Sequence, residues 1–390
     1  MDFDYVVMPA IIFVIGILIM WLYIRRILSL SKKSYRMGRK VAERIVLSIV
    51  ALVATVVVGS SSFNAIAIHW FRAHNPPPGE IYIVNGNKMR MYCTGSGTPT
   101  IILEAGLGDD AIVWRGVQPA LSKTTRVCAY DRAGLGWSDP LPPPRDADHI
   151  AADLHGLLRE AKITGPVVLM GHSVGGIYLR DYASRYPENV AGIVFVDSST
   201  PFQNKRTDPV RKAGGGIQQP PQWVGTLLQR AVFDTGIPRL LGQCSRTTPG
   251  FDAYAERLAA EDGCSVRASA IAAEGDSFDQ SSQETVHTGP YGALPILIFS
   301  HDPAAALSQK FPPAWVASHA LRVELENIWS EEQEDLKKLS TRSRRIVAKG
   351  SNHFIQWLRP DLIEKEVPLF IEQIRGRAPQ PATFGATTTE

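Results

Sequence analysis

The sequence lacks the motifs by which proteins usually hold metals, phosphates or nucleic acids. Its four cysteines form no Cys-x-x-Cys pair, so no zinc site is predicted. It contains no glycine-rich phosphate-binding motif and no basic patch with interleaved aromatic residues. We therefore expect neither a cofactor, a metal nor a nucleic-acid partner.

Charge is also missing from two stretches near the amino terminus. Residues 6–24 and 45–70 contain no Asp, Glu, Lys or Arg, and each is long enough to cross a hydrocarbon core of about 30 Å as a helix. The intervening residues 25–44 are strongly basic, with Glu43 as their single acid. Because basic loops face the cytoplasm, this pattern predicts a membrane hairpin over 1–72 with both ends and the remaining chain outside the cytoplasm.

Other interpretations of these stretches stay open. They are also compatible with buried core helices or with a signal peptide, and Ala65-Ile66-Ala67 resembles a cleavage site. Residues 73–80 include three consecutive prolines, which predict a stiff linker after the hairpin.

From Ile81 onward, β-favouring runs alternate with helical patterns, which predicts a mostly parallel sheet covered by helices on both faces. The alternation stops over 198–293, where Gly and Pro clusters mix with helical pieces. A stretch of that length predicts an inserted helical lid. Regular elements resume at Leu294 and end with a helix around 361–375, and residues 377–390 are expected to be a flexible tail.

The most informative motif is Gly171-His172-Ser173-Val174-Gly175, between a short apolar run and a helical pattern. A sharp turn from strand to helix exposes a serine oxygen for attack on an acyl carbon, and small neighbours make the turn possible. The motif therefore predicts a nucleophile elbow at Ser173. A Gly-rich turn with a solvated serine is the alternative.

Several segments in this order resemble the α/β-hydrolase fold, over about residues 81–376. The resemblance is carried by the elbow together with Gly106-Leu107-Gly108, the segment Tyr130-Asp131-Arg132-Ala133-Gly134-x-Gly136-x-Ser138, and Gly350-Ser351-Asn352-His353. It implies an eight-stranded, mostly parallel sheet and a serine esterase or lipase-like activity. The serine at position 173 sets the chain apart from the dehalogenases and epoxide hydrolases of this fold, which carry an aspartate nucleophile at that position.

A serine nucleophile needs a base, and the base needs an acid that fixes its tautomer. His353 is the candidate base because it follows the last regular strand, after the serine in chain order. His172 is a rival that is expected to pack beside the nucleophile. Two acids remain candidates: Asp302 follows the strand where many hydrolases carry theirs, and Asp197 ends the strand before it.

The resemblance also assigns the oxyanion donors, which are the backbone amides of Leu107 and Val174. Asp131, Arg132 and Trp137 are expected to stabilise the loop that follows their strand. Of the three possible pairings of the cysteines, the fold favours Cys93 with Cys128 on neighbouring strands and Cys244 with Cys264 within the lid. Four buried thiols are the alternative.

The leading hypothesis is a membrane-anchored serine hydrolase that cleaves an ester or lipid-like small molecule. A catalytically silent binding or envelope-assembly module is the alternative from another class, and an acyltransferase or amidase lies between them. Apolar lid residues would suit an acyl chain or form the core of the lid itself: Trp223, Leu227, Leu228, Val232, Phe233, Leu240 and Leu241.

Overall fold

The computed structural model describes residues 7–32, 37–213, 222–245, 252–262, 264, 267–308, 318–377 and 385–390. They form two compact units, Met1–Pro77 with Trp223–Ser269, and Pro78–Gln222 with Ala270–Glu390. The segment expected as one lid is therefore divided, since its middle part groups with the amino-terminal helices. We call the two parts the amino-terminal unit and the sheet unit.

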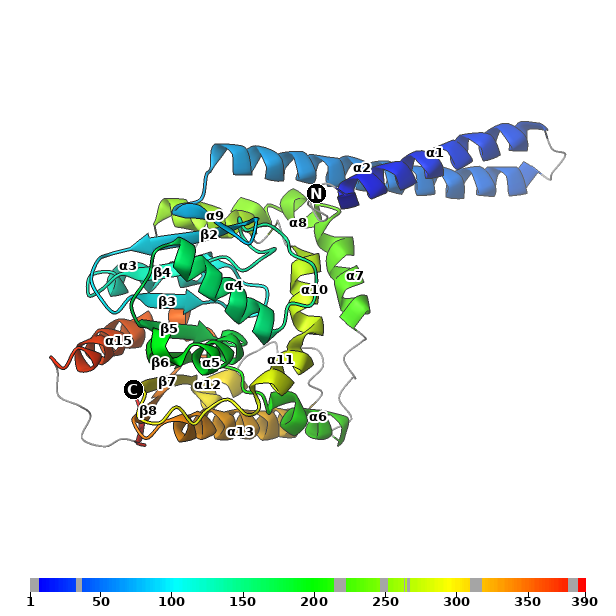
Figure 1. Ribbon diagram of the computed structural model, residues 1–390. Coiled ribbons are helices and arrows are strands. Elements are labelled where there is room, and N and C mark those ends of the chain that lie inside the picture. Colours follow the sequence, from blue (N-terminus) through cyan, green and yellow to red (C-terminus); the bar gives the residue numbers. More distant parts are fainter. Residues whose placement is uncertain are drawn as a thin grey trace. The chain divides into compact units, whose positions relative to one another are not determined.

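The sheet unit is built on nine strands in the order β1-β2-β4-β3-β5-β6-β7-β8-β9 (Figure 1). The first two neighbour pairs in this order are antiparallel and all the others are parallel. The strands are β1 Glu80–Val84, β2 Asn87–Thr94, β3 Ile101–Glu104, β4 Val127–Tyr130, β5 Val167–His172, β6 Val190–Val196, β7 Ile296–His301, β8 Ser343–Ala348 and β9 Thr387–Thr389.

The predicted number of eight strands is wrong, because β9 lies within the segment expected to be a flexible tail. Thr388 pairs with Ile346 in a parallel ladder along the outer edge of β8. Three successive β-branched threonines favour an extended backbone, so they suit this edge. Residues 378–384 of the same segment lie outside the described residues.

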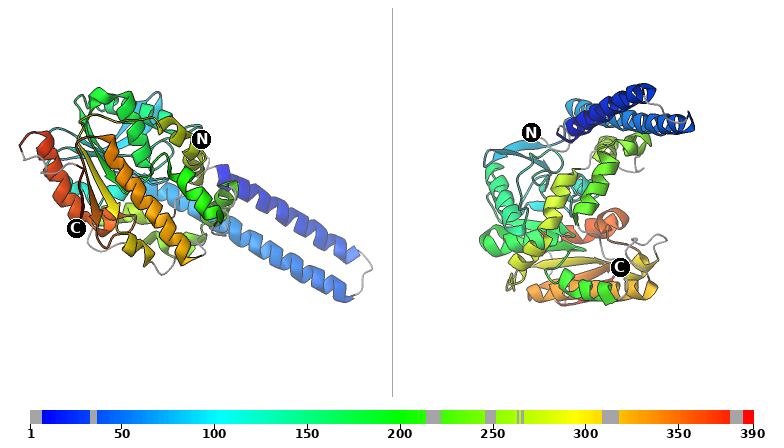
Figure 2. Two further views of the ribbon diagram at one scale, coloured as in Figure 1. Left: turned by 90° about the horizontal axis from the view of Figure 1, so that it is seen from below. Right: turned by 90° about the vertical axis from the view of Figure 1, so that its right-hand side faces the viewer.

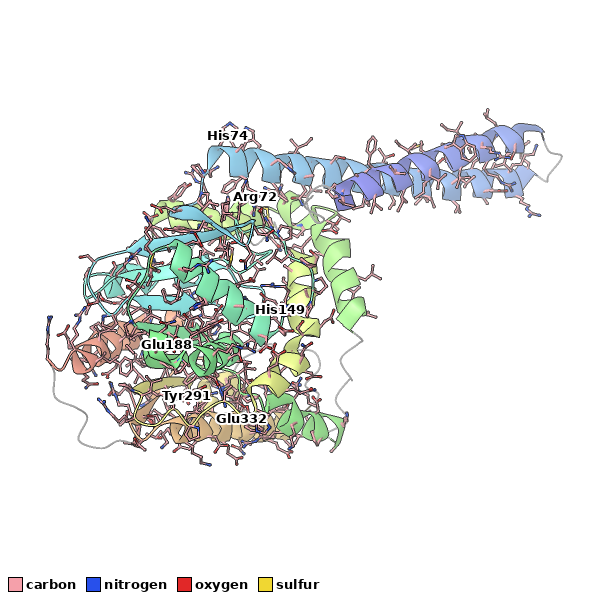
Figure 3. The ribbon with its side chains drawn as sticks, viewed as in Figure 1. Arg72, His74, His149, Glu188, Tyr291 and Glu332 are labelled. Carbon is pink, nitrogen blue, oxygen red and sulfur yellow. A yellow bond between two sulfur atoms is a disulfide. The ribbon has the colours of Figure 1, made fainter. Side chains whose placement is uncertain are left out.

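The central strands are apolar along their whole length because helices cover both faces of the sheet. Ile101 and Leu103 pack with α15 (Pro360–Ile374) on one face, and Ile102 packs with α4 (Ala147–Glu160) and α5 (Gly175–Arg185) on the other. In Figure 2, α15 and α13 lie on opposite sides of the sheet. Tyr291, labelled in Figure 3, connects the segment before β7 to α5 by donating to the carbonyl of Arg180 over 2.9 Å.

The helices of the sheet unit lie between the strands in chain order and range from single turns to the 17 residues of α13. They are η2 Ala111–Trp114, α3 Gln118–Leu121, α4 Ala147–Glu160, α5 Gly175–Arg185, η3 Pro187–Asn189, α6 Gln203–Ala213, α11 Phe278–Thr285, α12 Pro303–Leu307, α13 His319–Asp335, η5 Leu336–Leu339, α14 Ile355–Leu358 and α15 Pro360–Ile374. Helix α10, Ala268–Asp276, begins in the amino-terminal unit and continues into this one.

The amino-terminal unit contains two long helices, α1 Met8–Lys32 and α2 Met37–His74, which pack side by side (Figure 1). Both are long and apolar enough to cross a membrane, with mean hydropathies of 2.2 and 2.3 in their most apolar windows. They extend further into the basic segment than predicted, since Lys and Arg are good helix formers. The same unit contains α7 Gln222–Phe233, α8 Ile237–Leu240, η4 Gln243–Ser245 and α9 Ala253–Asp262.

Two disulfides join the four cysteines in the pairs favoured above. Cys93 and Cys128 face each other across β2 and β4 and are bonded. Cys244 and Cys264 are bonded within the amino-terminal unit. Both pairings are therefore confirmed, and the alternative of four free thiols is not.

Candidate active site

Ser173 lies in the turn that connects β5 to α5, and its backbone is in the left-handed region with φ +53°. A non-glycine residue adopts this conformation only at a cost of about 1–3 kcal/mol, which the surrounding structure must supply. The flanking glycines allow the tight turn. A Cβ atom on Gly171 would lie 2.7 Å from Leu179 Cδ1, and one on Gly175 would lie 2.8 Å from the carbonyl oxygen of Ala105.

The two candidate acids have different surroundings. Asp197 follows β6, is fully buried, and its Oδ2 lies 2.6 Å from Nδ1 of His353. Asp302 instead caps α12 by accepting from the Ala304 amide over 2.9 Å, and it also accepts from the Gly350 amide over 3.0 Å. The structure therefore brings Asp197 and His353 together and gives Asp302 a backbone-capping position.

A second histidine, which the sequence analysis missed, contacts the same aspartate. Nδ1 of His301 lies 2.8 Å from Oδ2 of Asp197, and its other ring nitrogen lies 2.7 Å from Oε2 of Glu326. Oδ1 of Asp197 accepts from the His301 amide and the Trp329 indole, each over 3.0 Å. The only sequence signal was the position of His301 at the end of β7, where the carboxyl ends of parallel strands meet.

These contacts decide the charges of the cluster. Burial favours a neutral Asp197, but the charges and hydrogen bonds of His301 and His353 outweigh burial and hold the pKa of Asp197 well below its usual range. Burial likewise favours a neutral His301, yet Asp197 and Glu326 outweigh it and raise the pKa of His301 to about 10. At neutral pH the cluster therefore contains an aspartate beside an imidazolium.

Asp197, His301 and His353 each offer one atom that could bind a metal, and these atoms lie within 4.8 Å of one another. However, the contacts from Asp197 to the two rings measure 2.6 and 2.8 Å. Two ligands of a tetrahedral zinc lie about 3.3 Å apart, as follows from its bond lengths. The distances therefore fit a hydrogen-bonded cluster better than a set of metal ligands.

His172 is buried beside Ser173, and its surroundings favour the neutral ring. Burial, followed by the charge of His353, lowers the pKa of His172 to about 3. Its Nε2 lies 3.0 Å from the carbonyl oxygen of His353, and the two rings are 4.6 Å apart. This neutral ring packs against the His353 loop. The Ser173 hydroxyl and the His353 ring make no hydrogen bond in the described chain, and such bonds commonly tighten only when substrate binds.

The turn after β3 lies directly against the elbow. A Cβ atom on Gly106 would lie 3.4 Å from Ser173 Cβ and 3.0 Å from Nδ1 of His172. Leu107 follows in this turn, and Val174 caps the amino end of α5. Among the described residues, neither of these two amides donates to a protein acceptor, which leaves both available to an oxygen of a bound substrate.

Arg132 holds this turn in place through buried contacts. It donates to the carbonyl of Gly106 over 2.6 Å and to the carboxylates of Glu104 and Glu274 over 2.7 Å each. Glu274 in turn accepts from the Gly108 amide over 3.0 Å. The loop after β4 is held by Asp131, which accepts from the Trp137 amide over 2.9 Å.

The comparisons with known proteins agree with this architecture. A sequence model of the α/β-hydrolase fold matches residues 99–240. An AB hydrolase superfamily protein of Gibberella zeae is 24% identical over 299 residues, which cover 71% of this chain and 87% of that protein. The protein YbdG of Bacillus subtilis is 30% identical over 166 residues, 42% of this chain and 51% of its own length. An uncharacterised protein of Schizosaccharomyces pombe is 33% identical over 153 residues, 32% of this chain and 29% of its own length.

Solved structures extend the likeness over most of the chain. An esterase from Thermogutta terrifontis superimposes with a TM-score of 0.53 at 17% identity, covering 76% of this chain and 99% of the esterase. The haloalkane dehalogenase DbeA from Bradyrhizobium elkani does so with a TM-score of 0.54 at 19% identity, covering 77% and 99%. The chain has the α/β-hydrolase fold. At these identities the likeness shows the fold and leaves the reaction to be argued from the site.

Proposed function

We propose that the protein is a membrane-anchored serine hydrolase that cleaves carboxylic esters through an acyl-enzyme on Ser173. The carrying observation is the buried contact of 2.6 Å between Asp197 and His353, at the edge of the sheet where Ser173 occupies a strained elbow. Acyl transfer requires a base that is fixed by an acid and lies near a serine hydroxyl.

In the proposed reaction, the hydroxyl oxygen of Ser173 attacks the ester carbonyl while His353 takes the proton of that hydroxyl. Asp197 accepts from Nδ1 of His353 and stabilises the imidazolium that forms. The amides of Leu107 and Val174 donate to the oxyanion, and each such donor typically lowers the barrier by about 3–4 kcal/mol. The protonated His353 then gives its proton to the departing alcohol. In the second half-reaction, His353 takes a proton from water as the water attacks the acyl-enzyme, and it returns that proton to Ser173 as the carboxylic acid leaves.

The membrane part of the proposal has separate support. Helices α1 and α2 are long and apolar enough to span a bilayer, and the basic segment between them favours the cytoplasmic side. The sheet unit and the amino-terminal unit each carry one disulfide. Disulfides persist in oxidising compartments, so they agree with a hydrolase domain outside the cytoplasm.

A fluorophosphonate probe tests the chemistry, because it reacts covalently with an activated serine. We expect labelling of the full-length protein in detergent and none of the variant Ser173→Ala. Equal labelling of both proteins, or of neither, would refute the serine hydrolase and favour the binding module. Transfer of the acyl group to an added alcohol or amine in place of water would identify an acyltransferase.

A further inference from the structure

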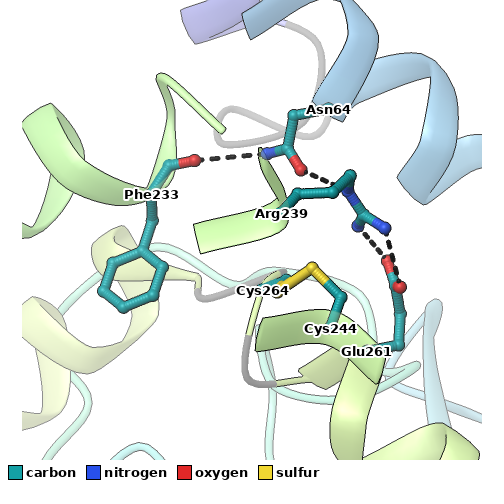
Figure 4. Close-up of a disulfide and its surroundings, with 6 residues drawn as sticks. All are labelled: Asn64, Phe233, Arg239, Cys244, Glu261 and Cys264. Atoms are coloured by element: carbon teal, nitrogen blue, oxygen red, sulfur yellow. Dashed lines mark hydrogen bonds and ion pairs between the residues drawn. A yellow bond between two sulfur atoms is a disulfide. The ribbon is translucent and has the colours of Figure 1, made fainter. Parts of the chain in front are cut away.

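The amino-terminal unit contains an apolar surface joined to one end of α2. The turn between α7 and α8 is bonded to this helix at Ser60, which donates to the Thr235 carbonyl, and at Asn64, which donates to the Phe233 carbonyl over 3.2 Å. Figure 4 shows Asn64 also accepting from Arg239 over 2.7 Å. These contacts hold the turn firmly against the helix.

The contact lies at a definite depth along α2. Glu43 forms an ion pair with Arg26 near the basic end of the hairpin, and the uncharged stretch of α2 begins at Ile45. At 1.5 Å per residue, Ser60 lies about 22 Å and Asn64 about 28 Å along the helix from Ile45. Since a hydrocarbon core is about 30 Å thick, the bonded turn lies at the outer boundary of the core.

Large apolar side chains of α7, α8 and the residue after it are exposed beside this turn. They are 43–66% exposed and comprise Leu227, Leu228, Val232, Ile237, Leu240 and Leu241. A patch of this kind marks an interaction site in a soluble domain. Exposed apolar residues of α2 lie at the same level along that helix as the bonded turn, including Phe63 and Ile66, which are 54% and 68% exposed.

We propose that the α7–α8 surface lies in the outer leaflet of the bilayer that α1 and α2 cross. The inference rests on the membrane anchoring proposed above. Interfacial helices bury their apolar faces about 5–10 Å into the boundary between headgroups and acyl chains, which is the level at which the turn meets α2. The occupant of the patch is therefore lipid.

Photocrosslinking tests this placement without depending on activity. The full-length protein is reconstituted in phosphatidylcholine vesicles that contain a phosphatidylcholine with a diazirine on its acyl chain, and labelled peptides are identified by mass spectrometry. We expect lipid adducts within 222–245 as well as on α1 and α2. In the double variant Leu240→Glu and Leu241→Glu, the yield of lipid adducts within 222–245 should fall at least about five-fold.

Leu369→Glu, at an exposed position of α15, is the matched control and should leave the adducts unchanged. Adducts on α1 and α2 but none within 222–245 would overturn the inference. A second copy packed on the patch would give that same result, because it would keep the labelled acyl chains away from 222–245. No adducts anywhere would refute the membrane anchor itself.

A second inference concerns His301, whose ring lies between two carboxylates. The distances are 2.8 Å to Oδ2 of Asp197 and 2.7 Å to Oε2 of Glu326. A ring with a carboxylate at each nitrogen donates at both, so it is an imidazolium. The oxygen of Asp197 that it contacts is the one that also accepts from His353.

We infer that His301 is a positioning residue that holds Asp197 and offsets its negative charge, and that it thereby limits how strongly this carboxylate attracts a proton to His353. An unbalanced Asp197 would favour the protonated form of His353, which cannot accept the proton of Ser173. The adjacent imidazolium opposes that effect. This inference rests on the proposed triad and adds a fourth residue to it.

Other charged or titratable groups also face the cluster and stay in place when His301 is replaced. Asp302 follows His301, Arg345 of β8 interacts electrostatically with Asp197, and Asp109 and His172 interact with His353. Because none of them is altered in the variants below, a shift in pH dependence reports the charge that was removed.

The pH profile of kcat/KM with a soluble ester tests the role of His301. We expect His301→Asn to move the acid limb to higher pH by about one unit. Trp329→Phe is the matched control because it removes a neutral donor to the same carboxylate; it should lower kcat and leave the limb in place. Glu326→Gln removes a negative charge while Asp197 still holds the imidazolium, so it should move the acid limb to lower pH. This variant replaces His301→Asn as the test if His301→Asn does not fold.

An acid limb that coincides in wild type and His301→Asn would overturn this inference, as would an equal shift in Trp329→Phe. If His301→Asn does not fold, an unmoved limb in Glu326→Gln overturns it. Failure of the proposed function looks different, because the wild type itself would then show no turnover and no labelling of Ser173.

Discussion

His353 and Asp197 are in contact although 156 positions separate them in the chain, with Nδ1 of the histidine 2.6 Å from the buried carboxylate. Asp302, the other candidate, accepts backbone amides at the start of α12. This difference in environment leads to a direct test of the acid.

We expect Asp197→Asn to lower kcat for ester hydrolysis by about 10⁴-fold, because an amide holds the His353 ring in the wrong tautomer. Asp302→Asn should change kcat by less than about ten-fold, since asparagine caps a helix about as well as aspartate does. The measurement is steady-state hydrolysis of a soluble ester by both variants. A larger loss in Asp302→Asn would assign the acid to that residue.

Arg132 supports the turn after β3, which contains the proposed oxyanion donor Leu107, and forms buried ion pairs with Glu104 and Glu274. Arg132→Met should lower the free energy of unfolding by about 3–5 kcal/mol, because it leaves two buried acids without their cation. Arg159→Met, which breaks an exposed pair with Glu160, should change it by less than about 1 kcal/mol. Urea unfolding followed by circular dichroism measures both, and similar losses would contradict the role of Arg132.

The pKa of His301 predicts a loss of stability at alkaline pH. Its folded pKa, raised to about 10, exceeds the ordinary value of 6.5, so its contacts stabilise the fold fully below pH 6.5 and this contribution is lost as the pH rises toward 10. The pKa of Asp197 is lowered from 3.8, so its contribution is present above that pH and is lost on acidification. Unfolding midpoints of wild type and His301→Asn should converge between pH 6.5 and 10; a constant gap would contradict this.

The proposed topology predicts which sites a protease reaches. In sealed vesicles with the extracytoplasmic face outward, trypsin should cleave within the hydrolase domain and spare the basic segment 25–44, because the membrane shields it. Mass spectrometry of the released and retained peptides gives the answer. After detergent is added, the basic segment should become cleavable, and its cleavage in intact vesicles would reverse the topology.

Much of the architecture is readable from the sequence because local patterns determine it. The apolar run, the glycines of the elbow and the following helical pattern predict the β5–Ser173–α5 turn, and its strained φ is found in the structure. Likewise, the two long apolar helices are found near the expected residues. Their lengths and the basic segment were already encoded by neighbouring residues.

The sequence by itself thus determined the fold class, the elbow at Ser173 and the pair of apolar helices, since each depends on residues close together in the chain. The tertiary structure alone decided that His353 meets Asp197 and not Asp302, that His301 shares the same carboxylate, and that β9 completes the sheet. Those outcomes depend on how the ends of distant strands meet at one edge of the sheet, where differences of a few ångströms decide which side chain forms the hydrogen bond.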